Sequence, residues 1–134
     1  MSIDSSGNFN VYGWAFYDGV NLNNENSIEK EIIFRNKSTN QDRIRETVSN
    51  IYSTDLSDWS HAPLNYARYD GRVDITSLPK GEYLILINIR TGSVNKLDAL
   101  KSNYALTNIV SYANGKTYTL SNTGEGTAIT LKIS

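Results

Sequence analysis

The pattern of apolar and polar positions along the chain predicts an all-β protein. Its clearest segment is residues 82–90, in which apolar side chains occupy both faces: Tyr83, Ile85, Ile87 and Ile89 on one, Leu84 and Leu86 on the other. A strand that is apolar on both faces is typical of a central position in its sheet. The preceding Pro79-Lys80-Gly81 argues against a helix, because Pro fixes φ and Gly adopts turn conformations.

The same reasoning predicts further strands at residues 8–17, 29–36, 43–52, 66–75, 109–112, 116–121 and 127–133. Asn114-Gly115 is the strongest turn signal between them, since this dipeptide favours two-residue hairpins. Both faces of the first strand carry apolar groups, which predicts cover on both sides and a core position for Trp14. Gly13 beside it predicts a bulge or a close approach of another group to the backbone.

Two segments have no clear pattern. Residues 53–65 form a long irregular segment that holds the second tryptophan and the only histidine. Residues 92–108 fit a short helix, because Leu97, Leu100 and Tyr104 have helical spacing, and they fit an irregular loop equally well.

One stretch carries a resemblance to a known fold. Leu78-Pro79-Lys80-Gly81-Glu82-Tyr83, after Asp74-Ile75, resembles the entry into a late strand of immunoglobulin-like and fibronectin-like domains of bacterial multidomain proteins. The resemblance implies that Tyr83 forms a tyrosine corner, in which its hydroxyl bonds to nearby backbone. Together with the strand spacing it favours an immunoglobulin-like β-sandwich of seven to nine strands, with a jelly roll as the alternative. This motif occurs in sandwiches of unrelated function, so it supports the fold alone.

A second resemblance concerns function. Val11-Tyr12-Gly13-Trp14-Ala15-Phe16, together with residues 66–75, is similar to accessory β-sandwich domains fused to bacterial glycosyltransferases and wall-polysaccharide enzymes, the teichoic-acid type among them. The resemblance implies an assembly or glycan-contacting module, with catalysis elsewhere in the parent protein. It identifies no binding residue.

Length and charge limit the number of domains and the classes of partner. The 134 residues fit one domain, residues 8–134, with residues 1–7 expected as a linker or as the cut edge of a piece of a larger protein. A net charge of −1 without a Lys/Arg run argues against nucleic-acid and anionic-membrane partners, and no segment is long and apolar enough for membrane insertion. The first residues lack the features of a signal peptide. Absence of Cys fits a cytoplasmic protein or an exported Gram-positive one, with the cell surface slightly favoured.

The sequence offers little for catalysis. The only possible histidine base is His61, and the adjacent Ser60 points away from it on an extended chain. The carboxylates available as a glycosidase pair are Asp55, Asp58, Asp70 and Asp74. Asp55 with Asp58, or Asp18 with nearby Asn side chains, could supply calcium ligands, but solvated carboxylates that cap turns explain them better. With one His and no Cys, a transition-metal site is not expected. We therefore expect no catalytic residue, no metal and no cofactor.

Binding remains, and the predicted ligand-binding residues lie within and after the irregular segment: Trp59, His61, Tyr66, Arg68 and Tyr69. Aromatic rings stack on sugars, and long loops in compact domains are often functional. The alternative is that Trp59 and Tyr66 pin this segment onto the core.

The predicted function is a non-catalytic accessory module with glycan or protein as partner. The alternatives are a structural spacer or self-association domain forming a homo-oligomer, and thirdly a small hydrolase. Ring stacking predicts an exposed Trp59, whereas the spacer predicts a buried one.

Overall fold

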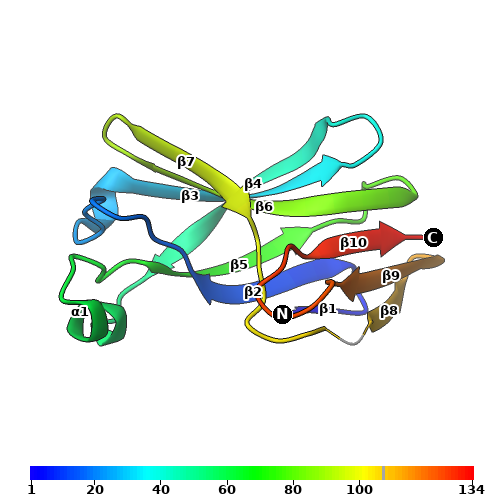
Figure 1. Ribbon diagram of the computed structural model, residues 1–134. Helices are drawn as coiled ribbons and strands as arrows, with labels where there is room; N and C mark the ends of the chain where they lie inside the picture. Colours follow the sequence, from blue (N-terminus) through cyan, green and yellow to red (C-terminus); the bar gives the residue numbers. More distant parts are fainter. Residues whose placement is uncertain (107) are drawn as a thin grey trace.

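An antiparallel sheet that nearly closes on itself makes up the protein, as the computed structural model shows for residues 1–106 and 108–134 (Figure 1). The prediction of an all-β chain is confirmed. Within the described residues the strands are β1 (Ser2–Ile3), β2 (Asn8–Trp14), β3 (Ile28–Asn36), β4 (Asp42–Ile51), β5 (Arg68–Asp74), β6 (Gly81–Thr91), β7 (Val94–Ala99), β8 (Ile109–Ala113), β9 (Lys116–Ser121) and β10 (Thr130–Ile133). Two helical turns accompany them, the 3-10 turn η1 (Glu25–Ser27) and α1 (Asp55–Ser60).

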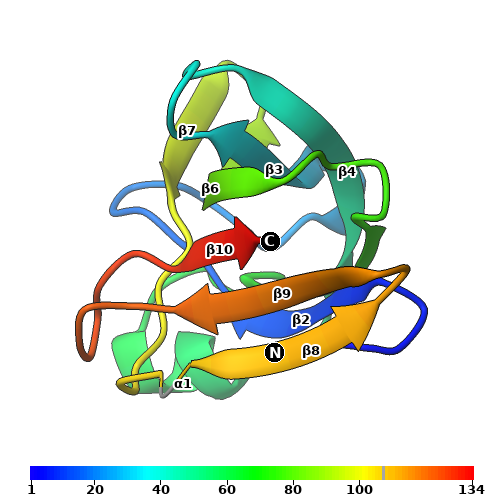
Figure 2. The ribbon, with the colours of Figure 1, turned by 90° about the vertical axis from the view of Figure 1, so that its right-hand side faces the viewer.

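The strands follow the spatial order β1-β2-β5-β4-β3-β6-β10-β9-β8, and β7 pairs with the second half of β6. Strand β4 connects two parts of this order, because residues 42–48 pair with β3 while residues 49–51 pair with β5. Figure 2 shows β8, β9 and β2 on one side of the interior and β3, β4 and β6 on the other. The Ser111 hydroxyl of β8 donates to the carbonyl of Ile3 in β1 at 2.8 Å, so the two ends of the order meet.

Strand β6 has the central position that its pattern predicts. It pairs with β3 along one edge and with β10 and β7 along the other. Its inward residues Tyr83, Ile85 and Ile89 are at most 1% exposed, and burial of each such side chain contributes roughly 1.5–3 kcal/mol. The Tyr83 hydroxyl donates to the carbonyl of Pro79 at 2.7 Å, which is the hydrogen bond expected of a tyrosine corner.

The predicted hairpin turn at Asn114-Gly115 is confirmed. Asn114 has φ +52° and Gly115 has φ +71°, and they connect β8 to β9. Two successive positive φ values match the twist of the flanking strands, which is why this dipeptide is favoured.

Two segments differ from expectation. Residues 1–7, expected as a linker or domain edge, include β1, and Ile3 is buried against the core. Residues 92–108, expected as a short helix or loop, contain β7, which forms a hairpin with β6 after a turn at Gly92 (φ +57°). Strand β7 is largely exposed, so it lacks the apolar alternation by which strands are recognised. Thr107, also in that segment, lies outside the described residues.

A lysine side chain is fully buried beside the strand junction. Lys30 of β3 is 0% exposed, and its ammonium donates to Asn50 Oδ1 at 2.7 Å, to the Arg68 carbonyl at 3.2 Å and to the Tyr66 carbonyl. Burial lowers the pKa of Lys30 to about 8. Three acceptors match the three donors of an ammonium group, so Lys30 joins β3 to β4 and β5.

Candidate functional site

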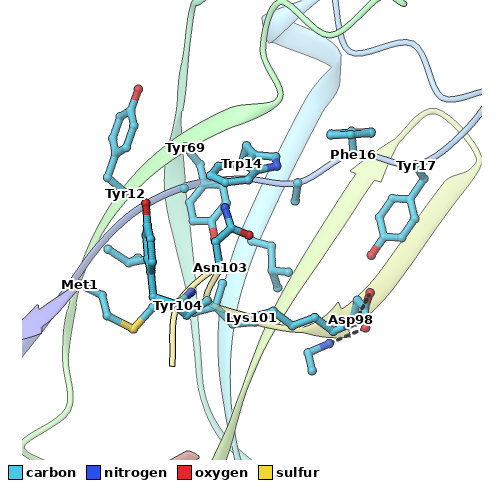
Figure 3. A pocket seen from close by; sticks show the side chains of 17 residues that line it. Met1, Tyr12, Trp14, Phe16, Tyr17, Tyr69, Asp98, Lys101, Asn103 and Tyr104 are labelled. Carbon is cyan, nitrogen blue, oxygen red and sulfur yellow. Dashed lines mark hydrogen bonds and ion pairs between the residues drawn. The ribbon is translucent and has the colours of Figure 1, made fainter. Parts of the chain in front are cut away.

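A cavity of about 400 Å³ lies beside the second half of β2 (Figure 3). Strand β1 pairs with β2 only at Phe9 and Asn10, so the rest of β2 has β5 as its neighbour along one edge. Residues 98–104, which comprise the last two residues of β7 and the segment after it, line the opposite side of the opening. The cavity therefore marks the place where the sheet does not close.

The hydrogen-bond pattern shows which backbone groups face this cavity. The N–H of Ala15 donates to the carbonyl of Ala67 at 3.0 Å, so odd-numbered residues of β2 bond toward β5. The carbonyl of Asn8 accepts from the N–H of Asp4 at 3.0 Å, so even-numbered residues bond toward β1. Because this alternation is fixed in an antiparallel strand, the backbone groups of Tyr12 and Trp14 point to the edge that no described strand pairs.

The deepest part of the cavity is apolar apart from one hydroxyl. Its buried residues are Val11, Tyr69, Ile87 and Leu100, each at most 5% exposed. A Cβ on Gly13 would lie 2.9 Å from the Tyr69 hydroxyl oxygen, so the close approach predicted at Gly13 is confirmed. Within the described ranges no hydrogen bond to this hydroxyl occurs, and burial raises the pKa of Tyr69. The floor thus carries no charge.

Aromatic and polar side chains surround the opening. Tyr12 is 58% exposed, Trp14 43% and Tyr104 77%. Figure 3 shows Tyr17 directed toward Asp98, which pairs with Lys101 at 3.9 Å. Burial and the nearby Asp98 carboxylate raise the pKa of Tyr17. The prediction of a core position for Trp14 is wrong, because its side of β2 is left partly open to solvent.

Arg68 of β5 packs against the two aromatic side chains that β2 contributes to the opening. Its guanidinium carbon lies 5.6 Å from the ring centre of Trp14 and 5.9 Å from that of Tyr12. Arg68 Nε donates to both carboxylate oxygens of Asp55, the first residue of α1, at 3.1 and 3.0 Å. Hydrogen bonding to Arg68 holds the pKa of Asp55 well below its usual range. The pair fixes the guanidinium against both rings.

The structure separates the five residues predicted to bind a ligand. Tyr69 forms part of the cavity floor, and the Arg68 guanidinium packs against the rings of Tyr12 and Trp14. Tyr66 packs edge-on against Tyr52 with ring centres 5.5 Å apart. Trp59 on α1 is 77% exposed, and His61 ends α1 with φ +56° in an exposed position. Among residues 1–106 and 108–134, no hydrogen bond or ring contact joins Trp59 or His61 to the other three.

The exposure of Trp59 bears on two of the sequence alternatives. A side chain that is 77% exposed does not pin the irregular segment onto the core. Exposure is also what ring stacking requires of Trp59. Two other residues attach this segment to the core instead: Leu56, which packs against it, and Leu64, which is 3% exposed.

Sequence reasoning missed the residues at the opening: Tyr12, Trp14, Asp98, Lys101 and Tyr104. The aromatic pair at positions 12 and 14 of one strand face was a usable signal, had that face been taken as exposed. The polar residues of the opening could not be recognised from sequence, because Asp98 lies in β7 and the apolar pattern does not reveal this strand.

No group of three or more His, Asp or Glu side chains able to hold a metal ion occurs in the part of the chain that the structure describes. Asp55, one of the carboxylates considered for calcium, is engaged by Arg68. Within the same residues, no helix has the length and apolar character needed to cross a membrane.

Comparison of the chain with protein-family models, curated proteins and solved structures found no match in any of the three.

Proposed function

We propose that this chain is a non-catalytic accessory domain that binds cell-surface glycan in the cavity beside β2. The observation that carries the proposal is an open cavity of about 400 Å³ with exposed aromatic rings on one side and polar side chains on the other. Volumes of this order are typical of small-ligand sites, and a few placed polar groups give such sites their specificity.

Each side of the opening has a role in this proposal. Trp14 and Tyr104 offer ring faces to the C–H face of a sugar, while Asp98, Lys101 and Asn103 offer hydrogen bonds to its hydroxyls. The Arg68–Asp55 pair holds the Trp14 ring in place before a ligand arrives. Fixing a side chain in advance reduces the entropy lost on binding.

We also propose an immunoglobulin-like relationship for the fold. The Tyr83–Pro79 hydrogen bond and the central position of β6 support it. Both features fit a domain that serves as a module of a larger bacterial protein.

A second candidate function is self-association. Strand β8 is last in the spatial order, and its Val110 and Tyr112 are 46% and 74% exposed. Exposed apolar side chains on a terminal strand are suited to contact with another copy.

The two tryptophans allow a direct test of the glycan proposal. Trp59→Phe leaves Trp14 at the cavity as the only indole, and Trp14→Phe leaves Trp59 on α1. Both proteins are titrated with a panel of bacterial wall glycans while tryptophan emission is recorded. We expect a glycan to shift the emission of the Trp59→Phe protein and to leave that of the Trp14→Phe protein unchanged.

The reverse result would move the site to α1, where the sequence prediction placed it. No change in either protein, together with no binding by calorimetry, would reject glycan binding. Sedimentation of the wild type and Tyr112→Ser then tests self-association, which predicts a concentration-dependent oligomer that the substitution weakens.

A further inference from the structure

The floor of the cavity restricts the chemical groups that can bind more than its opening does. Val11, Ile87 and Leu100 present buried aliphatic surface, and the Tyr69 hydroxyl is the polar side-chain group beside them. A charged group placed there would lose its hydration without gaining an opposite charge. A group that is itself polar on every side would leave the aliphatic surface without an apolar partner. The floor therefore suits a small neutral group that is partly apolar.

The Tyr69 hydroxyl is available to such a group. It lines the cavity and has no hydrogen-bond partner among the described residues. Tyr118 provides a contrast, because its hydroxyl also has no partner but is enclosed and does not line the cavity. The Tyr69 hydroxyl is not among the enclosed polar atoms without a partner, so solvent reaches it and a ligand acceptor would take the place of water there. Tyr69 is thus poised to donate to a carbonyl oxygen.

The edge of β2 supplies the complementary acceptor. The backbone carbonyls of Tyr12 and Trp14 face the cavity without a strand partner among the described residues. Carbonyl groups on a free strand edge accept hydrogen bonds from ligand N–H groups. The cavity therefore combines an apolar surface, one hydroxyl donor and a row of carbonyl acceptors.

We infer that the cavity takes the acetamido group of an N-acetylated sugar, an inference that rests on the proposed glycan binding. The methyl group lies against Val11, Ile87 and Leu100, and the acetyl oxygen accepts from the Tyr69 hydroxyl. The amide N–H donates to a carbonyl on the free edge of β2. The sugar ring then occupies the opening, beside Trp14 and Tyr104.

The test uses N-acetylglucosamine and glucose as probes, which differ in the acetamido group. Affinities are measured by NMR titration for the wild type, Tyr69→Phe and the matched control Tyr118→Phe. We expect N-acetylglucosamine to bind the wild type about tenfold more tightly than glucose, and Tyr69→Phe to weaken it about five- to tenfold, as for loss of one hydrogen bond. Tyr118→Phe leaves both affinities unchanged. Saturation-transfer spectra of the wild type show the largest effect at the acetyl methyl protons.

The outcomes separate the two proposals. Equal affinities for the two sugars, or binding of N-acetylglucosamine that Tyr69→Phe leaves unchanged, overturns the acetamido inference and leaves glycan binding standing. Failure of both sugars and of the glycan panel to bind overturns glycan binding, and the inference with it. Thermal melting checks that each variant is folded. If Tyr69→Phe does not fold, the sugar comparison and the methyl saturation on the wild type decide.

Discussion

Lys30 and Tyr69 are both buried polar side chains, yet their surroundings differ. Lys30 is 0% exposed, and three oxygen acceptors surround its ammonium group. Tyr69 is 1% exposed, and its hydroxyl faces a cavity without a partner in the described part of the chain. A buried polar group whose hydrogen bonds are complete supports the fold, whereas one that is left without a partner beside a cavity is available to a ligand.

The partners of Lys30 show what it supports. Asn50 belongs to β4, Arg68 is the first residue of β5, and Tyr66 lies two residues before it. Lys30 therefore secures the place where β4 passes from its pairing with β3 to its pairing with β5. Removing Lys30 is expected to damage the fold, and removing the Tyr69 hydroxyl is expected to affect binding.

The largest expected effect is that of Lys30→Met. The substitution keeps the aliphatic chain but leaves Asn50 Oδ1 and two backbone carbonyls without their donor, which we expect to lower the free energy of unfolding by about 2–4 kcal/mol. Urea denaturation measures it. Lys132→Met, an exposed lysine of β10, is the control and should change stability by less than about 0.5 kcal/mol. Similar values for the two variants would show that Lys30 is not structural.

The second effect is a rise of stability with pH. The pKa of Lys30 is about 8 in the folded protein and near the ordinary lysine value of 10.5 when unfolded. Between these values the unfolded chain binds more protons, so stability increases with pH, by about 2–3 kcal/mol between pH 8 and pH 10. Above pH 10 the raised pKa values of Tyr17, Tyr69 and Tyr118 act in the opposite direction. Urea denaturation across this range measures the rise.

The Lys30→Met protein is the control for this pH dependence. Its stability should be level between pH 8 and pH 10. A rise of equal size in both proteins would assign the effect to another group.

The third effect concerns the contact between Gly13 and Tyr69. Gly13→Ala places a methyl 2.9 Å from the hydroxyl oxygen and 3.0 Å from Cζ. We expect a loss of about 1–3 kcal/mol, as for other overpacked sites. In the Tyr69→Phe background the cost should fall, because the closest atom is absent. A double-mutant cycle measured by thermal melting tests this, and identical costs in both backgrounds would mean that Tyr69 moves away without penalty.

The smallest effects compare two tyrosine hydroxyls. Tyr83→Phe removes the hydrogen bond to the Pro79 carbonyl and should cost about 1 kcal/mol. Tyr69→Phe removes a hydroxyl that makes no such bond, and should change stability by less than about 0.5 kcal/mol. Denaturation of the two variants under the same conditions measures the difference. A cost for Tyr69→Phe as large as that for Tyr83→Phe would reveal a structural role for its hydroxyl.

The parts of the fold that could be predicted from sequence depend on local signals. Strand β6 was recognised because both its faces are apolar, and the β8–β9 turn because Asn114-Gly115 favours positive φ. The Tyr83 hydroxyl bonds to a carbonyl only four residues away, so a ten-residue motif was enough to anticipate it. In each case the determining contacts lie within one short stretch of chain.

The cavity could not be predicted in this way, because it depends on which strands are neighbours. Strand β1 is two residues long, and β7 is too exposed to show alternation. Trp14 shares with Tyr12 the face of β2 that points away from the core, and which face points outward depends on how distant segments pair. Of the five predicted site residues, Tyr69 lies in the cavity floor, although the prediction named it for its nearness to Trp59 in the sequence.

The division of β4 between two neighbours has a consequence for how the domain unfolds. Its first part is hydrogen-bonded to β3 and its last part to β5, with Lys30 bridging the junction. Neither group of strands can separate without breaking pairing along this one strand. We therefore expect a single cooperative transition in which both groups lose structure together, and uniform hydrogen-exchange protection along the paired amides of β4.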